Sequence, residues 1–193
     1  MAKNPVAFLC ANPIPEMWPW DAKEAGAIVV ATGRSDFPNQ VNNSLGFPGI
    51  FRGTLDVRAK TITDEMCIAA AVEMAKMAEE KGLTPDYIMP TMDDVDVFPR
   101  EAAAVAVKAI EQGIARITNV TFEQEYEYAR KLIMRARGMV QDAMATGYIA
   151  LPEGSKPPKP SKMVVAAVEE SKAKPQAKKS ARRTGVAKKK RAR

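Results

Sequence analysis

Uncharged amides at two places in this 193-residue chain have the residue type and setting expected of a ligand site. Asn12 follows the apolar run 6–11, and the pair Asn42–Asn43 lies in a polar stretch that follows the apolar run 27–31. A side-chain amide offers donors and acceptors without a charge, so it suits a carboxamide, a hydroxyl or a carboxylate. These residues indicate the binding of a small polar molecule. An ordinary turn is the alternative interpretation, because Asn, Gly, Pro and Ser are also common loop residues.

The two apolar runs predict strands that bring these amides together. Residues 6–11 are continuously apolar, which predicts a strand buried on both faces, and Pro13 ends it. Residues 27–31 are short and β-branched, which predicts a second buried strand. The short crossover between the runs favours parallel pairing. The amides therefore fall at the carboxyl ends of parallel strands, where open α/β sheets bind ligands.

Helical patterns account for most of the remaining chain. A short helix is predicted from about Asp21, with Asp21 as its amino-terminal cap, and the tryptophans 18 and 20 are expected to close the edge of the core. Residues 45–57 predict a helix packed on the sheet. Thr63 caps a predicted helix that ends at Gly82. Its apolar residues recur at helical spacing and predict the buried face: Ile68, Ala71, Val72, Ala75 and Ala78. The methionines 66, 74 and 77 beside this face are expected to pack rather than to bind a cofactor.

Two further helices are expected before the composition changes. Residues 99–113 are rich in alanine, with Pro99 near the first helical position and an apolar face that includes Ala102, Val105 and Ala109. Residues 122–148 predict a long helix capped by Thr121, with acids in its first turns and bases further along, which is the charge order that the helix dipole favours. This last helix is a candidate subunit interface.

The net charge of +6 comes from the end of the chain. Residues 155–193 hold 14 Lys/Arg and two acids, which leaves 15 of the 29 Lys/Arg and 21 of the 23 Asp/Glu in residues 1–154, a net charge of −6. The Lys/Arg-rich segment 153–193 is predicted to be a disordered tail. Its basic clusters could bind nucleic acid or another polyanion, and a solubilising tail is the alternative.

Cysteine and carboxylate usage suggests no further chemistry. Cys10 and Cys67 lie in apolar segments and are expected to be buried free thiols, and no neighbouring base marks either as a nucleophile. With no membrane-length apolar stretch, the expected location is the cytoplasm. The acids at 93, 94 and 96 could suggest a metal site, but they lack the Gly and distal Glu of a calcium loop, so a solvated turn is the better interpretation.

Five motifs occur in order along the chain: ANPIPE at 11–16, TGRSDFPNQVNN at 32–43, FPGIFRG at 47–53, ITDEM at 62–66 and FPREAAAVAVK at 98–108. This ordered set resembles the smaller prokaryotic malic enzymes. The resemblance runs from about Pro5 to about Leu151 and covers only the carboxyl-terminal part of that family. It implies an α/β fold: the carboxyl-terminal half of a doubly wound, Rossmann-like parallel sheet, then a helical subdomain and the basic tail. The expected boundaries are 1–60, 61–152 and 153–193.

The resemblance also implies a function. Malic enzymes oxidise malate with NAD or NADP and decarboxylate the product to pyruvate, using Mg²⁺ or Mn²⁺. Asn12 matches an asparagine near the nicotinamide ribose and malate, and Asn43 matches one that bonds malate's carboxylate. Asn42 is a further cofactor-binding candidate. Hydride transfer needs the hydroxy acid and the nicotinamide ring held face to face, and amides can hold both.

Other parts of that machinery have no counterpart in the sequence. No G-x-G-x-x-G occurs among the eleven glycines. In the family this turn, the metal-binding carboxylates and the acid–base Lys and Tyr precede the Asn-Pro motif. We therefore expect the chain not to catalyse alone. Its expected partners are a complementary amino-terminal malic enzyme segment or further copies of itself, because the strand edge at 6–11 would otherwise be left exposed.

Overall fold

The computed structural model describes residues 2–162 and 165, and it divides the chain into two compact units, 1–136 and 137–193. The first unit holds two strands and four complete helices, and α5 (Phe122–Ala145) runs across the boundary. This boundary falls inside the helical region predicted over 61–152. Most of the tail predicted over 153–193 lies outside the described residues.

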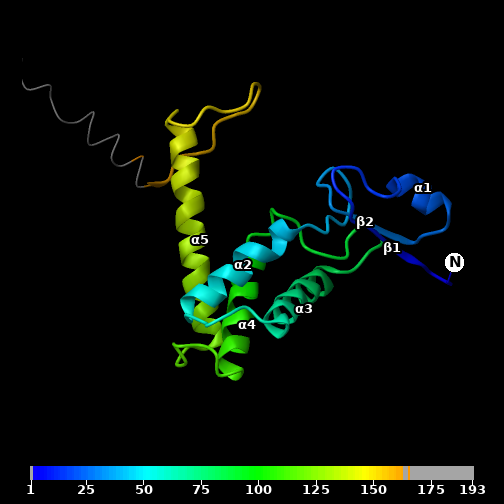
Figure 1. The fold of residues 1–193 in the computed structure, drawn as a ribbon. Coiled ribbons are helices and arrows are strands. Elements are labelled where there is room, and N and C mark those ends of the chain that lie inside the picture. Colours follow the sequence, from blue (N-terminus) through cyan, green and yellow to red (C-terminus); the bar gives the residue numbers. More distant parts are fainter. Residues whose placement is uncertain (1, 163–164, 166–193) are drawn as a thin grey trace, which may run out of the picture. The chain divides into compact units, whose positions relative to one another are not determined.

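A parallel pair of strands confirms the predicted α/β class. Strand β1 (Val6–Leu9) pairs with β2 (Val29–Thr32) in parallel, with Val6 opposite Val29 and Leu9 opposite Thr32. Figure 1 shows the two strands side by side, joined through α1 (Pro19–Glu24). Strand β2 is largely buried, as predicted.

The prediction that β1 is buried on both faces is wrong. Its side chains alternate between exposed and half-buried, and Val6 and Phe8 are 52% and 56% exposed. The inward-facing side chains, Ala7 and Leu9, pack on a small core formed by Ala22, Ala27 and Val30. Within the described residues nothing covers the other face of β1, so half of its apolar side chains face solvent.

Proline rather than aspartate sets the start of α1. The helix begins at Pro19, whose fixed φ suits the first helical turn, and Trp18 takes the cap position without a side-chain hydrogen bond. Asp21 lies inside the first turn, so its predicted role as the cap is wrong. Its carboxylate still lies where the helix dipole favours a negative charge.

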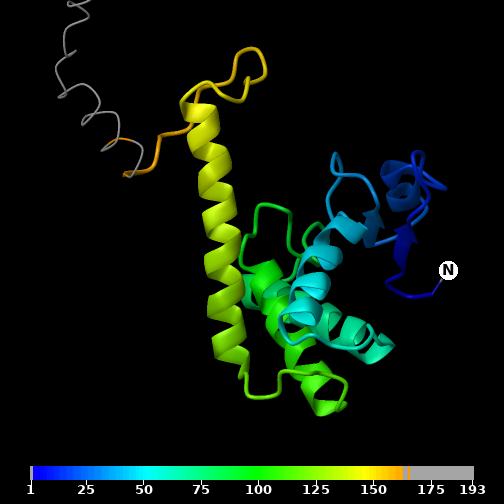
Figure 2. The same ribbon diagram turned by 60° about the vertical axis from the view of Figure 1, so that its left-hand side comes forward.

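Close packing of α2 (Asn43–Asp56) against α4 (Val97–Glu111) forms the centre of the helical part (Figure 2). Two glycines of α2 make this approach possible. A Cβ on Gly53 would lie 2.2 Å from the carbonyl oxygen of Ala102. Helix α2 therefore packs mainly on α4 and on α3 (Asp64–Lys81) rather than on the sheet as predicted.

The ends of α3 are as predicted, but of its predicted buried face only Ala78 is buried. Thr63 Oγ1 accepts a hydrogen bond from Met66 N, and Gly82 ends the helix with a φ of 94°. The buried residues of this helix are Met66, Ala70, Glu73, Met77 and Ala78. Ile68 and Val72 face solvent instead, because the methionines, which are longer and unbranched, fill the space beside α2 and α4.

The last two helices are confirmed with small changes of boundary. Helix α4 begins at Val97 rather than Pro99, and the predicted face of Ala102, Val105 and Ala109 is buried. At the start of α5, Thr121 Oγ1 accepts from Gln124 N while Gln124 Oε1 accepts from Thr121 N, which is a capping box.

The two cysteines differ from expectation in their exposure. Cys10 and Cys67 are free thiols, as predicted, but both are exposed rather than buried. Glu125, in the first turn of α5, is buried, and desolvation, followed by its contact with Asp56, raises its pKa to about 8. Among the described helices none is long and apolar enough to cross a membrane.

Candidate functional site

Two loops that follow the parallel strands form the candidate site. Residues 10–18 follow β1 and residues 33–42 follow β2, so both loops leave the carboxyl ends of the two parallel strands. A guanidinium joins them, because Arg34 Nη1 donates to the carbonyl oxygen of Pro13 at 3.0 Å. The structure therefore brings the predicted amides to one edge, as their positions after parallel strands required.

Asn12 lies against the second loop. A Cβ on Gly33 would be 3.2 Å from both the Nδ2 and the Oδ1 of Asn12, so a larger residue there would make the amide shift by a few tenths of an ångström. The side chain of Asn12 stays exposed. Its neighbour Ala11 donates its N–H to Glu16 Oε2 at 3.1 Å, and this bond lowers the pKa of Glu16.

The two adjacent asparagines have different surroundings. Asn42 is the cap of α2: its Oδ1 accepts from Ser44 N at 3.0 Å, and its Nδ2 donates to the carbonyl oxygen of Gly33 at 2.9 Å. Asn43 begins the helix, and its side chain is exposed. Asn12 and Asn42 thus meet at Gly33, while Asn43 has its amide open to a ligand.

A small hollow lies beside this pair. Its volume is about 240 Å³, and it is mostly apolar. The lining residues are Val41, Asn42, Asn43, Gly46, Phe47, Ile50, Met74 and Met89. The apolar lining with a few polar groups at the rim resembles that of a small-molecule site, and the volume is below the usual range of about 300–1,000 Å³.

An aromatic cluster flanks the loops. Trp18 and Trp20 stack with ring centroids 5.2 Å apart, and Phe37 packs edge-on against both. The guanidinium of Arg34 lies 5.9 Å from the ring centre of Trp18 and is bound to Asp36, which lowers the pKa of that carboxyl. The tryptophans were expected to close the edge of the core. They pack on Phe37 of the loop after β2 instead, and Trp20 is largely exposed.

The sequence did not single out Asn39. It is buried, its Nδ2 donates to the carbonyl oxygens of Val30 and Pro85, and its Oδ1 accepts from Ile88 N. Its φ of 56° lies in the left-handed region, which asparagine tolerates better than most residues. Asn39 therefore fixes the path of the site loop. The signal that could have indicated this was its place among turn residues directly after β2.

The acidic residues near 94 are held by cations of the protein. Asp94 binds Lys81 and accepts from Thr91 N, while Asp96 accepts from Arg130 at 3.1 Å. Across the described residues, no group of three or more His, Cys, Asp or Glu side chains could hold a metal ion.

Comparison with known proteins identifies the family that the sequence resembles. Residues 26–113 match the family described as "Malic enzyme, NAD binding domain". The chain carries malic enzyme sequence. It is 58% identical over 132 residues to a bifunctional malic/malolactic enzyme of Bacillus subtilis, covering 68% of this chain and 32% of that protein. It is 46% identical over 131 residues to an NADP-dependent malic enzyme of Halomonas elongata, covering 60% of this chain and 31% of that protein.

A solved structure supports the fold as well as the sequence. The malic enzyme of Entamoeba histolytica superimposes with a TM-score of 0.77 at 46% identity, covering 90% of this chain and 34% of that one. The chain therefore spans about a third of the length of the malic enzymes it matches. The family resemblance, the Rossmann-like fold class and a nicotinamide dinucleotide as the family's cofactor are confirmed.

Proposed function

We propose that this chain supplies part of the nicotinamide and malate site of an NAD(P)-dependent malic enzyme, which oxidises malate and releases pyruvate and CO₂. The observation that supports this most directly is the meeting of Asn12 and the Asn42–Asn43 pair at the carboxyl ends of two parallel strands. Matches to malic enzymes along most of the chain support the choice of reaction.

The donors at this edge suit the proposed ligands. A bound nicotinamide would supply the acceptor for the hydride on the alcohol carbon of malate. Asn43, with its exposed amide, would donate to a malate carboxylate, and Asn12 would face the ribose and malate. Asn42 is proposed to position the backbone around the site rather than to contact a ligand, since both ends of its amide bind backbone atoms of Gly33 and Ser44. Fixed amides of this kind orient the reactants without changing their charge.

The remaining machinery is proposed to come from a complementary amino-terminal malic enzyme segment. The sequence holds no G-x-G-x-x-G turn, and the described residues hold no candidate ligand set for Mg²⁺ or Mn²⁺. We therefore expect the isolated chain to be inactive. Its proposed location, with its substrate and cofactor, is the cytoplasm.

Complementation tests this proposal. The chain is co-expressed with the part of the Bacillus subtilis relative that it does not match, and malate-dependent reduction of NAD and NADP is followed by absorbance with Mg²⁺ or Mn²⁺ present. Activity should require both chains. Full turnover by the purified 193-residue chain would contradict the need for a partner, and an inactive but stable complex would contradict the catalytic role.

A second candidate function follows from the basic end of the chain. Fourteen Lys/Arg against two acids in residues 155–193 suit an electrostatic contact with nucleic acid or another polyanion. Deletion of residues 155–193 separates the two functions. Polyanion binding should be lost, while activity in the complemented enzyme should be kept.

A further inference from the structure

The hollow beside Asn43 has walls that come from distant parts of the chain. Val41 and Asn43 line one wall, where the loop after β2 leads into α2. Met89 lines another wall and belongs to the segment between α3 and α4. The width of the hollow therefore depends on how the loop after β2 and this later segment are held together.

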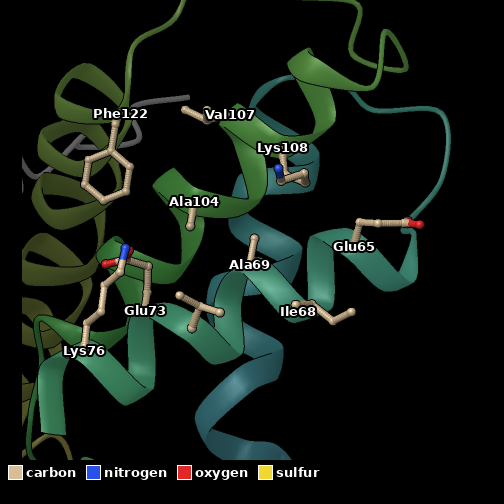
Figure 3. Close-up of a pocket in the computed structure, with 10 residues that line it drawn as sticks. Glu65, Ile68, Ala69, Glu73, Lys76, Ala104, Val107, Lys108 and Phe122 are labelled. Atoms are coloured by element: carbon tan, nitrogen blue, oxygen red, sulfur yellow. The ribbon is translucent and has the colours of Figure 1, made fainter. Parts of the chain in front are cut away.

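Size alone does not select this hollow. A larger groove of about 460 Å³ lies between α3 and α4, where Figure 3 shows Ala69 from α3 and Ala104 from α4. The asparagines of the candidate site do not line that groove. The smaller hollow differs in two ways: Asn42 and Asn43 line it, and one buried side chain is bonded to the segments that form both walls.

That side chain belongs to Asn39, which is 6% exposed. Its Oδ1 accepts from Ile88 N at 3.0 Å, directly before Met89, and its Nδ2 donates to the carbonyl oxygen of Pro85 at 2.8 Å. The same Nδ2 donates to the carbonyl oxygen of Val30 in β2 at 3.0 Å. All three partners are backbone atoms, so these bonds fix the path of the later segment relative to the sheet.

The backbone of Asn39 fixes the other wall. Its φ of 56° turns the chain in the left-handed region. Its carbonyl oxygen accepts from Thr32 N at 3.3 Å, and the carbonyl oxygen of Thr32 accepts from Val41 N at 2.7 Å. These bonds hold Val41 against the end of β2, two residues before α2 begins at Asn43.

We infer that Asn39 is a positioning residue for malate, because it sets the distance between the wall that carries Asn43 and the wall that carries Met89. This inference rests on the proposed function and deepens it. Asn39 acts through its neighbours, since both ends of its amide are bound to the backbone. Small displacements of binding groups can weaken a reaction strongly even when the changed residue does not touch the reactants.

Asn39→Gly is the main variant, because glycine adopts a positive φ without strain and removes all three side-chain bonds. In the complemented enzyme, this variant should raise KM for malate by at least about tenfold and change kcat by less than about threefold, the pattern of lost binding. Asn39→Asp keeps the acceptor for Ile88 N. Its KM relative to the unmodified enzyme should fall as pH falls, because a protonated carboxyl can also donate.

Two controls separate positioning from a loss of stability. Val105→Ala removes methyl groups from the buried core on α4, so it should lower stability and leave KM for malate within about twofold. Asp86→Asn removes an exposed ion pair with Lys23 from the segment that Asn39 binds, and it should change neither quantity.

Hydrogen exchange of the isolated chain gives a readout that needs no activity. Asn39→Gly should speed exchange over residues 39–43 and 86–90 by about tenfold or more, because both segments lose their common anchor. Exchange over α4 should stay unchanged. Mass spectrometry of the full chain measures these segments separately.

Faster exchange in both segments, together with a raised KM in Asn39→Gly but not in Val105→Ala, supports the inference. Unchanged exchange in either segment overturns it. An active complemented enzyme whose KM does not respond to Asn39→Gly, or responds equally to Val105→Ala, overturns the positioning role and leaves the proposed function intact. No activity with the unmodified chain and its complement overturns the proposed function and the effect on malate together, while exchange still decides whether Asn39 holds the two walls.

Discussion

At the scale of single residues, Asn42 and Asn43 show how neighbours of one type divide two tasks. Asn42 is held by hydrogen bonds at both ends of its amide, one capping α2 and one fixing Gly33. Asn43 points its amide to solvent from the first helical position. A residue whose amide is bound to the protein at both ends stabilises the fold, and a residue whose amide makes no bond within the protein can serve a ligand.

Alanine substitutions should separate these tasks. Asn42→Ala should lower the free energy of unfolding by about 1 kcal/mol, the usual effect of removing a helix cap. Asn43→Ala should leave unfolding nearly unchanged and lower kcat/KM for malate in the complemented enzyme by about tenfold or more, the loss of one or two hydrogen bonds. Urea unfolding and steady-state kinetics measure the two effects.

The control for this pair is Asn119→Ala, because Asn119 is an exposed asparagine in the loop between α4 and α5. It should change neither stability nor kinetics. If Asn43→Ala lowers stability as much as Asn42→Ala and leaves kcat/KM intact, then Asn43 is structural and the proposed role fails.

At the scale of elements, the contact between α2 and α4 depends on residues that have no room to change. Gly49 and Gly53 face α4, where an added Cβ would clash with Glu101 and with the carbonyl oxygen of Ala102. Glu101 is fully buried in this contact, and neither of its carboxyl oxygens has a hydrogen-bond partner. The helices thus pack closely around a carboxyl group that must be neutral to be tolerated.

Gly53→Ala should destabilise the chain by about 2 kcal/mol or more, because α2 must move away from α4 to admit the methyl group. Gly46→Ala in the same helix is the matched control. Its Cβ would meet only the side chain of Ile50 at 3.6 Å, so the higher helix propensity of alanine should leave stability unchanged or raise it by up to about 1 kcal/mol. Equal losses in both variants, measured by chemical denaturation, would contradict the close contact.

Glu101 should make stability depend on pH. Burial raises its pKa from 4.5 to about 9 in the folded chain, so the folded state keeps a proton that the unfolded state has lost across this range. Stability should therefore fall as pH rises, by about 1.4 kcal/mol per pH unit from this group alone. Glu101→Gln keeps the shape of the neutral carboxyl but cannot titrate. The difference in the free energy of unfolding between this variant and the unmodified chain should therefore grow, in favour of the variant, as pH rises.

The measurement is urea unfolding of the unmodified chain and of Glu101→Gln between about pH 5.5 and pH 8.5, within the window set by the two pKa values. Glu79→Gln, an exposed change on α3, is the control and should follow the unmodified chain at every pH. A constant difference between Glu101→Gln and the unmodified chain would mean that Glu101 titrates at its ordinary pKa.

At the scale of the whole molecule, two observations belong together: apolar side chains of β1 face solvent, and the chain corresponds to only part of its relatives. The chain spans about a third of the malic enzymes it matches. One face of β1 shows Val6 and Phe8 to solvent, and in the described residues β1 pairs only with β2. A free strand edge with apolar side chains readily pairs with another strand.

We predict that the complementary segment pairs with this edge. In the isolated chain, the β1 amides that do not bond β2 should exchange with solvent quickly. Adding the complementary segment should slow their exchange by at least about tenfold, since each then gains a hydrogen bond of its own. Hydrogen exchange read by mass spectrometry over residues 6–9 tests this, with the loop at residues 118–120 as the control segment. Unchanged exchange in a catalytically active complex would exclude pairing at β1.

The sequence alone determined the local parts of this protein. Residue pattern was enough to place two strands, their parallel pairing, the caps at Thr63 and Thr121, the end of α3 at Gly82, and the amides after the strands, because each of these depends on neighbours in the chain. The ordered motifs were enough for the family.

Only the tertiary structure decided which surfaces are buried. Helix α3 is apolar on several sides, so its spacing could not show that Met66 and Met77, rather than Ile68 and Val72, face the core. The same holds for the buried Glu101 and for the different surroundings of Asn42 and Asn43, which follow from contacts with α4 and with Gly33. Burial depends on residues far apart in the chain, and no local pattern contains that information.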